Sequence, residues 1–171
     1  MIDGATMEKE YSKSSFNKFI HAPWSYDKFA RVIFAVRLIV GCVFLSEGIQ
    51  KFLFSESLGV GRFIKIGIPA PEIMAPFVGV VEIVCGVLVL IGLITRLAAI
   101  PLIINMLVAI STTKIPILLE KGFWAMAHEA RVDWSMILGS LFLLIVGGGQ
   151  WSLDRLIEKR CDERNQEINK T

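Results

Sequence analysis

The sequence predicts an all-α integral membrane protein, a bundle of four transmembrane helices. Hydrophobic residues make up 54% of its 171 residues, charged residues only 20%, and the mean hydropathy is +0.60. Residues 97–113 and 134–153 contain no charged side chain, and residues 73–95 contain a single one, Glu82. Helices of such length can cross a hydrocarbon core of about 30 Å, where the backbone must satisfy its own hydrogen bonds.

The predicted elements follow the chain in order. Residues 1–30 lack the apolar run of a cleavable signal peptide, and their mixed aromatic and basic side chains fit a segment in the membrane interface or an ordinary juxtamembrane linker. The four-helix domain covers residues 31–154, and residues 155–171 form a charged tail. Glycine, proline and polar residues separate the predicted spans, which cover about 31–54, 72–94, 97–115 and 133–150.

The distribution of basic residues predicts the orientation. Most of the 18 Lys and Arg residues fall in the N-terminal segment, in the turn at Arg96 and in the tail, which four alternating spans place on one side. The positive-inside rule puts that side, and therefore both termini, in the cytoplasm at the inner membrane of the cell. Trp24 and Trp151 then lie at the inner interface, and Trp124 and Trp134 at the outer one.

Several ionisable residues lie within or at the ends of the predicted spans, where each costs about 2.5–3.5 kcal/mol on insertion and therefore needs a partner or a function. Helical spacing places Arg37, Gly41, Phe44, Gly48 and Lys51 on one stripe of the first span, with Glu47 at its edge. Gly79, Glu82 and Gly86 share a stripe of the second span, and small residues beside charges favour close helix packing. The predicted polar site, open toward the outer face, comprises Glu47, Lys51, Glu82, Lys114 and Asp133.

Two interpretations of this site stay open. It can bind a polar head group or move protons, or Lys51 and Lys114 can pair with the carboxylates only to fix helix packing. Asn105 and Thr112 share a face of the third span, and we expect them to form interhelical hydrogen bonds. Arg37 and Arg96 are predicted to anchor the protein in the inner leaflet.

Other functions find no support in the sequence. The net charge of +2 and the lack of a basic patch with stacking aromatics argue against nucleic acid as a partner. Three cysteines show no metal-ligand spacing, and His128-Glu129 does not complete a zinc motif because Val132 stands where the second histidine is needed. We predict no metal, no covalently bound cofactor and no identifiable catalytic residue.

Several stretches resemble the DoxX family of membrane proteins, and together they cover most of residues 31–155. The resembling residues are Arg37-Leu38, Gly41, Phe44, Gly48 to Phe52, Gly67 to Pro69, Val81-Glu82, Gly86, Leu90 to Ala99, Gly147 to Trp151 and Ser152 to Arg155. Lys51, Glu82, Arg37 and Arg96 match motif positions, although the family assigns them no firm chemical role. Two departures stand out: many members carry His in place of Glu47, and the closing motif often has Pro in place of Gly148.

The resemblance implies a four-helix membrane protein tied to membrane redox systems, with quinone or a similar lipophilic carrier as its ligand. A small bundle without a metal or flavin would act as an oxidoreductase subunit, and a soluble or peripheral partner would carry the redox cofactor. The alternatives are a non-enzymatic scaffold that docks a soluble oxidoreductase, or a small proton-coupled transporter. The bilayer is a partner in every case, and the sequence is compatible with an oligomer.

Overall fold

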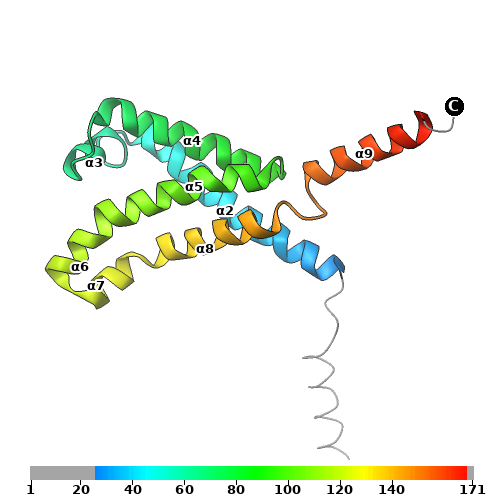
Figure 1. Cartoon of the computed structure of the whole chain (residues 1–171). Helices are drawn as coiled ribbons and strands as arrows, with labels where there is room; N and C mark the ends of the chain where they lie inside the picture. Colours follow the sequence, from blue (N-terminus) through cyan, green and yellow to red (C-terminus); the bar gives the residue numbers. More distant parts are fainter. Residues whose placement is uncertain (1–25, 169–171) are drawn as a thin grey trace, which may run out of the picture.

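The structure, a computed structural model, describes residues 26–168, and helices are its regular elements throughout that part of the chain (Figure 1). The predicted all-α class is confirmed for these residues. The helices that surround the core are α2 (Tyr26–Leu53), α4 (Pro71–Ile91), α5 (Thr95–Ala109) and α8 (Arg131–Val146). The others are α3 (Val60–Lys65), the π-helical turn η1 (Ile110–Lys114), α6 (Ile115–Lys121), α7 (Phe123–Glu129) and α9 (Leu153–Ile168).

Within the part of the chain that the structure describes, three helical stretches are long and apolar enough to cross a membrane, namely Lys28–Leu53, Pro71–Ile91 and Thr95–Lys121. Helix α8, in the region of the fourth predicted span, has 16 residues. At about 1.5 Å per residue it is shorter than a hydrocarbon core of about 30 Å. The fourth crossing and the cytoplasmic position of both termini therefore stay predictions. The predicted N-terminal segment, residues 1–30, lies almost entirely outside the described residues.

The third candidate span continues to Lys121, beyond the predicted end near residue 115. The helix passes Pro116 because one turn ahead of it has the hydrogen-bond pattern of a π-helix. Ile115 donates its N–H to the carbonyl of Ile110, five residues earlier, which is the hydrogen bond of a π-helix. Pro116 then lies at the start of α6, where its missing N–H is tolerated. The helical path therefore runs from Thr95 to Lys121.

Helices α2 and α4 approach each other closely through glycines. A Cβ atom at Gly48 would lie 2.7 Å from the carbonyl oxygen of Gly79, and one at Gly86 would lie 3.0 Å from the backbone nitrogen of Leu45. The predicted close packing of these two stripes is confirmed. In lipid, where apolar burial gives little driving force, such backbone proximity strengthens van der Waals packing between helices.

The four surrounding helices pack in sequence, α2 against α4, α4 against α5, α5 against α8, and α8 back against α2. Their core consists of apolar side chains with little exposure: Ile33, Val40, Phe44, Cys85, Val89, Ala98, Leu102, Met106, Met136 and Leu143. Large apolar side chains such as Ile73, Leu138 and Ile145 point outward and are exposed. An apolar exterior of this kind fits a protein whose solvent is lipid.

Helices α3, α6 and α7 lie at one end of the bundle and α9 extends from the other (Figure 1). We call these the α3 end and the α9 end. Lys51, in the last turn of α2, lies toward the α3 end, whereas the α4–α5 turn lies at the α9 end. The two ends differ in chemistry.

Candidate functional site

A buried polar cluster joins α2, α4 and α5. The Lys51 ammonium donates to Oε2 of Glu82 at 2.5 Å, and Nδ2 of Asn105 donates to Oε1 of the same carboxylate at 2.5 Å. Glu82 is 1% exposed and the Lys51 side chain is 12% exposed. Each oxygen of the carboxylate thus has a donor, as burial of a charge requires. We call these three residues the Glu82 cluster.

The Glu82 cluster lies near the middle of a candidate span. Glu82 is eleven residues from Pro71 and nine from Ile91, or about 16 Å and 14 Å along the helix axis. This depth is where a charged side chain is most costly in a bilayer. Asn105 supplies the interhelical hydrogen bond that was expected of it. Thr112 does not, because its hydroxyl donates to the carbonyl of Val108 in its own helix.

Lys114 and Asp133 form a second, separate ion pair. Their charged atoms lie 3.2 Å apart, and their side chains are 11% and 21% exposed. The pair links η1 to the first turn of α8, nine residues beyond Asn105 and hence about 13 Å further along the helix. The five predicted residues are therefore not one contacting cluster, since Lys51–Glu82 and Lys114–Asp133 occupy different depths.

Glu47 has a different environment from the other predicted site residues. Its side chain is exposed, and it makes no hydrogen bond or ion pair within residues 26–168. Lys51, one turn further along α2, is close enough in sequence for an i,i+4 pair, but its ammonium contacts Glu82. Glu47 thus lies beside the Glu82 cluster on the helix surface without joining it.

Apolar side chains separate the Glu82 cluster from the α9 end. Phe44 and Val40 follow one another along α2 in that direction, Val89 lies two turns beyond Glu82 on α4, and Leu102 precedes Asn105 on α5. All four are at most 2% exposed. Lys51 is more exposed than Glu82 and lies toward the α3 end. The polar interior is therefore closed toward the α9 end and nearest to solvent or lipid at the α3 end.

Arg37 lies on the other side of this apolar layer and is itself buried. Its guanidinium donates from Nε to the carbonyl of Val89 at 2.9 Å and from Nη2 to that of Leu90 at 2.6 Å. Nη1 donates to the carbonyls of Gly148 at 3.0 Å and Trp151 at 2.6 Å. Arg37 therefore satisfies the last carbonyls of α4 and ties them to the loop after α8.

Arg96 satisfies the end of α8 in a similar way but stays exposed. Its Nη2 donates to the carbonyl of Ile145 at 3.1 Å. The inner-leaflet role predicted for Arg37 and Arg96 stays a prediction, and the structure adds a contact function that the sequence did not reveal. Backbone carbonyls carry no residue-specific signal, so only the position of Arg96 at the start of α5 could have pointed to such a contact, whereas Arg37 lies in the middle of α2.

Comparison with known proteins places the chain among related membrane proteins. The family model described as DoxX matches residues 32–115. The "Uncharacterized membrane protein Rv3486" of Mycobacterium tuberculosis is 57% identical over 135 residues, which cover 75% of this chain and 83% of the relative. The "Putative oxidoreductase CatD" of Bacillus subtilis is 31% identical over 124 residues, which cover 72% of this chain and 85% of the relative. No solved structure matches the chain significantly.

Proposed function

Because the chain belongs to the DoxX family of membrane proteins, we propose that it is the membrane subunit of a redox complex. In this proposal the Glu82 cluster receives the head group of a quinone or a similar lipophilic carrier. The observation that carries the proposal is the pairing of Lys51, Glu82 and Asn105 near the middle of the candidate spans. The relative named as an oxidoreductase is consistent with it.

Energetics favour a function for these charges over a purely structural role. Placing an ionisable residue at the centre of a span costs about 2.5–3.5 kcal/mol. An interhelical hydrogen bond between polar side chains stabilises the folded protein by only about 0.6 kcal/mol on average. Neutral residues would join α2, α4 and α5 at lower cost, and the glycine contacts between α2 and α4 already hold two of these helices together.

The chemistry of the donor set fits a carbonyl-bearing head group. An ammonium has three N–H donors, and Lys51 uses one on Glu82. The remaining donors can bind a carbonyl oxygen, and the adjacent Glu82 carboxylate can accept or release a proton. When bound, a quinone would supply the two-electron chemistry that these side chains lack, while a partner subunit would carry the electrons to or from it.

The closed side of the cluster argues against the transporter alternative. A proton path across the membrane needs polar groups on both sides of Glu82, whereas Val40, Phe44, Val89 and Leu102 occupy the side toward the α9 end. The scaffold alternative has an observation of its own, because α9 extends from the bundle with Leu156 and Ile157 exposed (Figure 1). A soluble oxidoreductase docked there is compatible with the redox role.

The test is mass spectrometry of small molecules retained after gentle detergent purification from a host that makes quinones. We expect quinone in the wild type and its loss from Glu82→Gln. The matched control is Glu72→Gln, which changes an exposed carboxylate on the same helix and should retain quinone. Since Glu82→Gln leaves Lys51 without its counter-ion, the double variant Lys51→Leu/Glu82→Gln, which removes both charges, serves as the folded reference.

A folded double variant that still holds quinone would refute this site. Absence of quinone from the wild type, together with a protein partner retained by all variants, would favour the scaffold role instead.

A further inference from the structure

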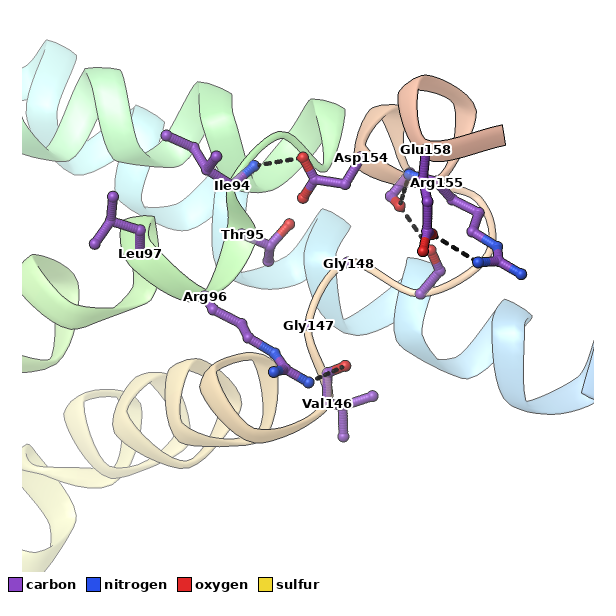
Figure 2. A pocket seen from close by; sticks show the side chains of 12 residues that line it. Ile94, Thr95, Arg96, Leu97, Val146, Gly147, Gly148, Asp154, Arg155 and Glu158 are labelled. Atoms are coloured by element: carbon purple, nitrogen blue, oxygen red, sulfur yellow. Dashed lines mark hydrogen bonds and ion pairs between the residues drawn. The ribbon is translucent and has the colours of Figure 1, made fainter. Parts of the chain in front are cut away.

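A pocket lined by both charged and apolar residues opens at the α9 end of the bundle, well away from the Glu82 cluster. It has a volume of about 670 Å³ and lies between the α4–α5 turn, the glycine loop after α8 and the first turn of α9 (Figure 2). Its lining includes Thr95 and Arg96 from the start of α5, and Asp154, Arg155 and Glu158 from α9. Neither the family resemblance nor the proposed function assigns a role to this pocket.

Contacts between distant parts of the chain hold the pocket walls in place. Asp154 accepts a hydrogen bond from the Ile94 N–H at 2.9 Å, and its own N–H donates to the carbonyl of Gly92 at 3.2 Å. Arg37 fixes the opposite wall through Gly148. Ile94 has a φ of 44°, a left-handed conformation that is strained for a β-branched residue. Such strain persists where surrounding contacts impose it, and it is frequent at ligand sites.

Hydrogen-bonding capacity in the pocket is left unused. The hydroxyl oxygen of Thr95 is buried and has no hydrogen-bond partner within the described residues, and it lies beside Gly148, facing the glycine loop (Figure 2). Among residues 26–168, the exposed guanidinium of Arg96 uses only Nη2, which donates to the carbonyls of Ile145 and Val146. Arg155 pairs with Glu158 at 2.6 Å, but both side chains are mostly exposed, so this pair is weak and open to exchange.

The position of the pocket relative to the membrane determines which ligands can reach it. The α4–α5 turn connects two helices that are long enough to cross the membrane, so it lies at a boundary between hydrocarbon and water. The exposed Trp151, next to the glycine loop, is typical of that boundary. Lipid phosphates are concentrated at this depth, where Arg is a preferred ligand for them.

We propose that this pocket binds the head group of a phospholipid whose phosphate carries a hydrogen-bond donor, such as an ethanolamine ammonium or glycerol hydroxyls. Arg96 holds the phosphate with its unused guanidinium donors, because a guanidinium matches phosphate oxygens geometrically. Arg155, which pairs with Glu158 (Figure 2), supplies a second positive charge to the pocket. Asp154 and Glu158 accept hydrogen bonds from the ammonium or hydroxyl groups. The two carboxylates thus select against a choline head group, which offers no N–H or O–H donor.

The test is native mass spectrometry of the delipidated full-length protein titrated with phosphatidylethanolamine, phosphatidylglycerol or phosphatidylcholine of identical acyl chains. We expect the first two lipids to bind about tenfold more tightly than phosphatidylcholine, the ratio expected for loss of one charge-assisted hydrogen bond. Arg96→Gln and Arg155→Gln should each weaken binding of both lipids by about tenfold. Arg62→Gln, an exposed arginine on α3, should leave it unchanged.

Thr95→Val separates a ligand role from a structural one. The change removes a buried hydroxyl that has no partner among the described residues, so the protein should fold at least as well, and we expect lipid binding to fall. Equal binding of the three lipids, or unchanged binding in both Arg96→Gln and Arg155→Gln, would overturn the proposal. Displacement of the lipid by millimolar inorganic phosphate would overturn the assignment to a lipid and point to a free anion.

Discussion

Lys51 and Glu82 depend on each other because both are charged and largely removed from water. Glu82 is almost completely buried, and its two oxygens accept from Lys51 and Asn105. Breaking such a pair by changing one partner leaves an uncompensated charge, whereas replacing both with neutral side chains removes the cost of burial as well as the attraction.

The stabilities of the single and double variants should therefore be strongly non-additive. Glu82→Gln alone should lower the free energy of unfolding by about 3 kcal/mol, because the Lys51 ammonium loses its counter-ion. Lys51→Leu/Glu82→Gln should recover most of that loss. Thermal unfolding in detergent, arranged as a double-mutant cycle, measures the coupling. Additive effects would mean that the two charges do not interact in the folded protein.

At the scale of helices, the contact between α2 and α4 rests on the absence of side chains. A Cβ atom at Gly48 would lie 2.7 Å from the Gly79 carbonyl oxygen, and backbone of this kind cannot move aside without separating the helices. The Glu82 cluster lies within the same contact, since Lys51 is less than one turn beyond Gly48 on α2. Helix spacing and ion-pair geometry are therefore linked.

Gly48→Ala should lower the midpoint of thermal unfolding by several degrees, because overpacking of this kind costs about 1–3 kcal/mol. It should also weaken quinone retention if the Glu82 cluster is the binding site. Cys42→Ala, on the exposed face of the same helix, is the control and should change neither property. An unchanged midpoint in Gly48→Ala would show that α2 and α4 can separate at little cost.

Local sequence patterns made several of these elements predictable. Features that depend on contacts between distant segments could not be predicted in this way. Uninterrupted apolar runs located the helices, and the glycine stripes on α2 and α4 predicted their close packing. The carbonyl contacts of Arg37 depend on how three distant segments meet, so no local pattern encodes them. The grouping of Lys114 and Asp133 with Glu82 failed because depth was counted from the ends of the spans, whereas the α5 residue level with Glu82 is Asn105, nine residues before Lys114.

At the scale of the whole molecule, α8 decides the topology. It follows the three candidate spans and has 16 residues, ending where Gly147 adopts a φ of 84°. If α8 crosses the membrane, the loop after α2 and the α9 helix lie on opposite sides, because α4, α5 and α8 make three crossings between them. If it does not cross, they lie on the same side.

Labelling with a membrane-impermeant maleimide should distinguish these arrangements. Cys161 is exposed on α9, whereas Cys85 is buried and Cys42 lies within a candidate span. We expect Cys161 to react only in inside-out vesicles. Ser57→Cys, placed in the exposed loop after α2 in a Cys161→Ser background, should react only in right-side-out vesicles. Reaction of both from one side would contradict four crossings, and the reverse pattern would contradict cytoplasmic termini.

The Arg37 contacts have a consequence for biogenesis. Arg37 enters the membrane with the first helix, but its acceptors at Val89 and Leu90 follow 52 and 53 residues later, and those at Gly148 and Trp151 follow 111 and 114 residues later. At about 5–20 residues per second of synthesis, the guanidinium waits several seconds for its last partners. A ribosome that stops before the glycine loop leaves the guanidinium in the bilayer without two of its four carbonyl acceptors.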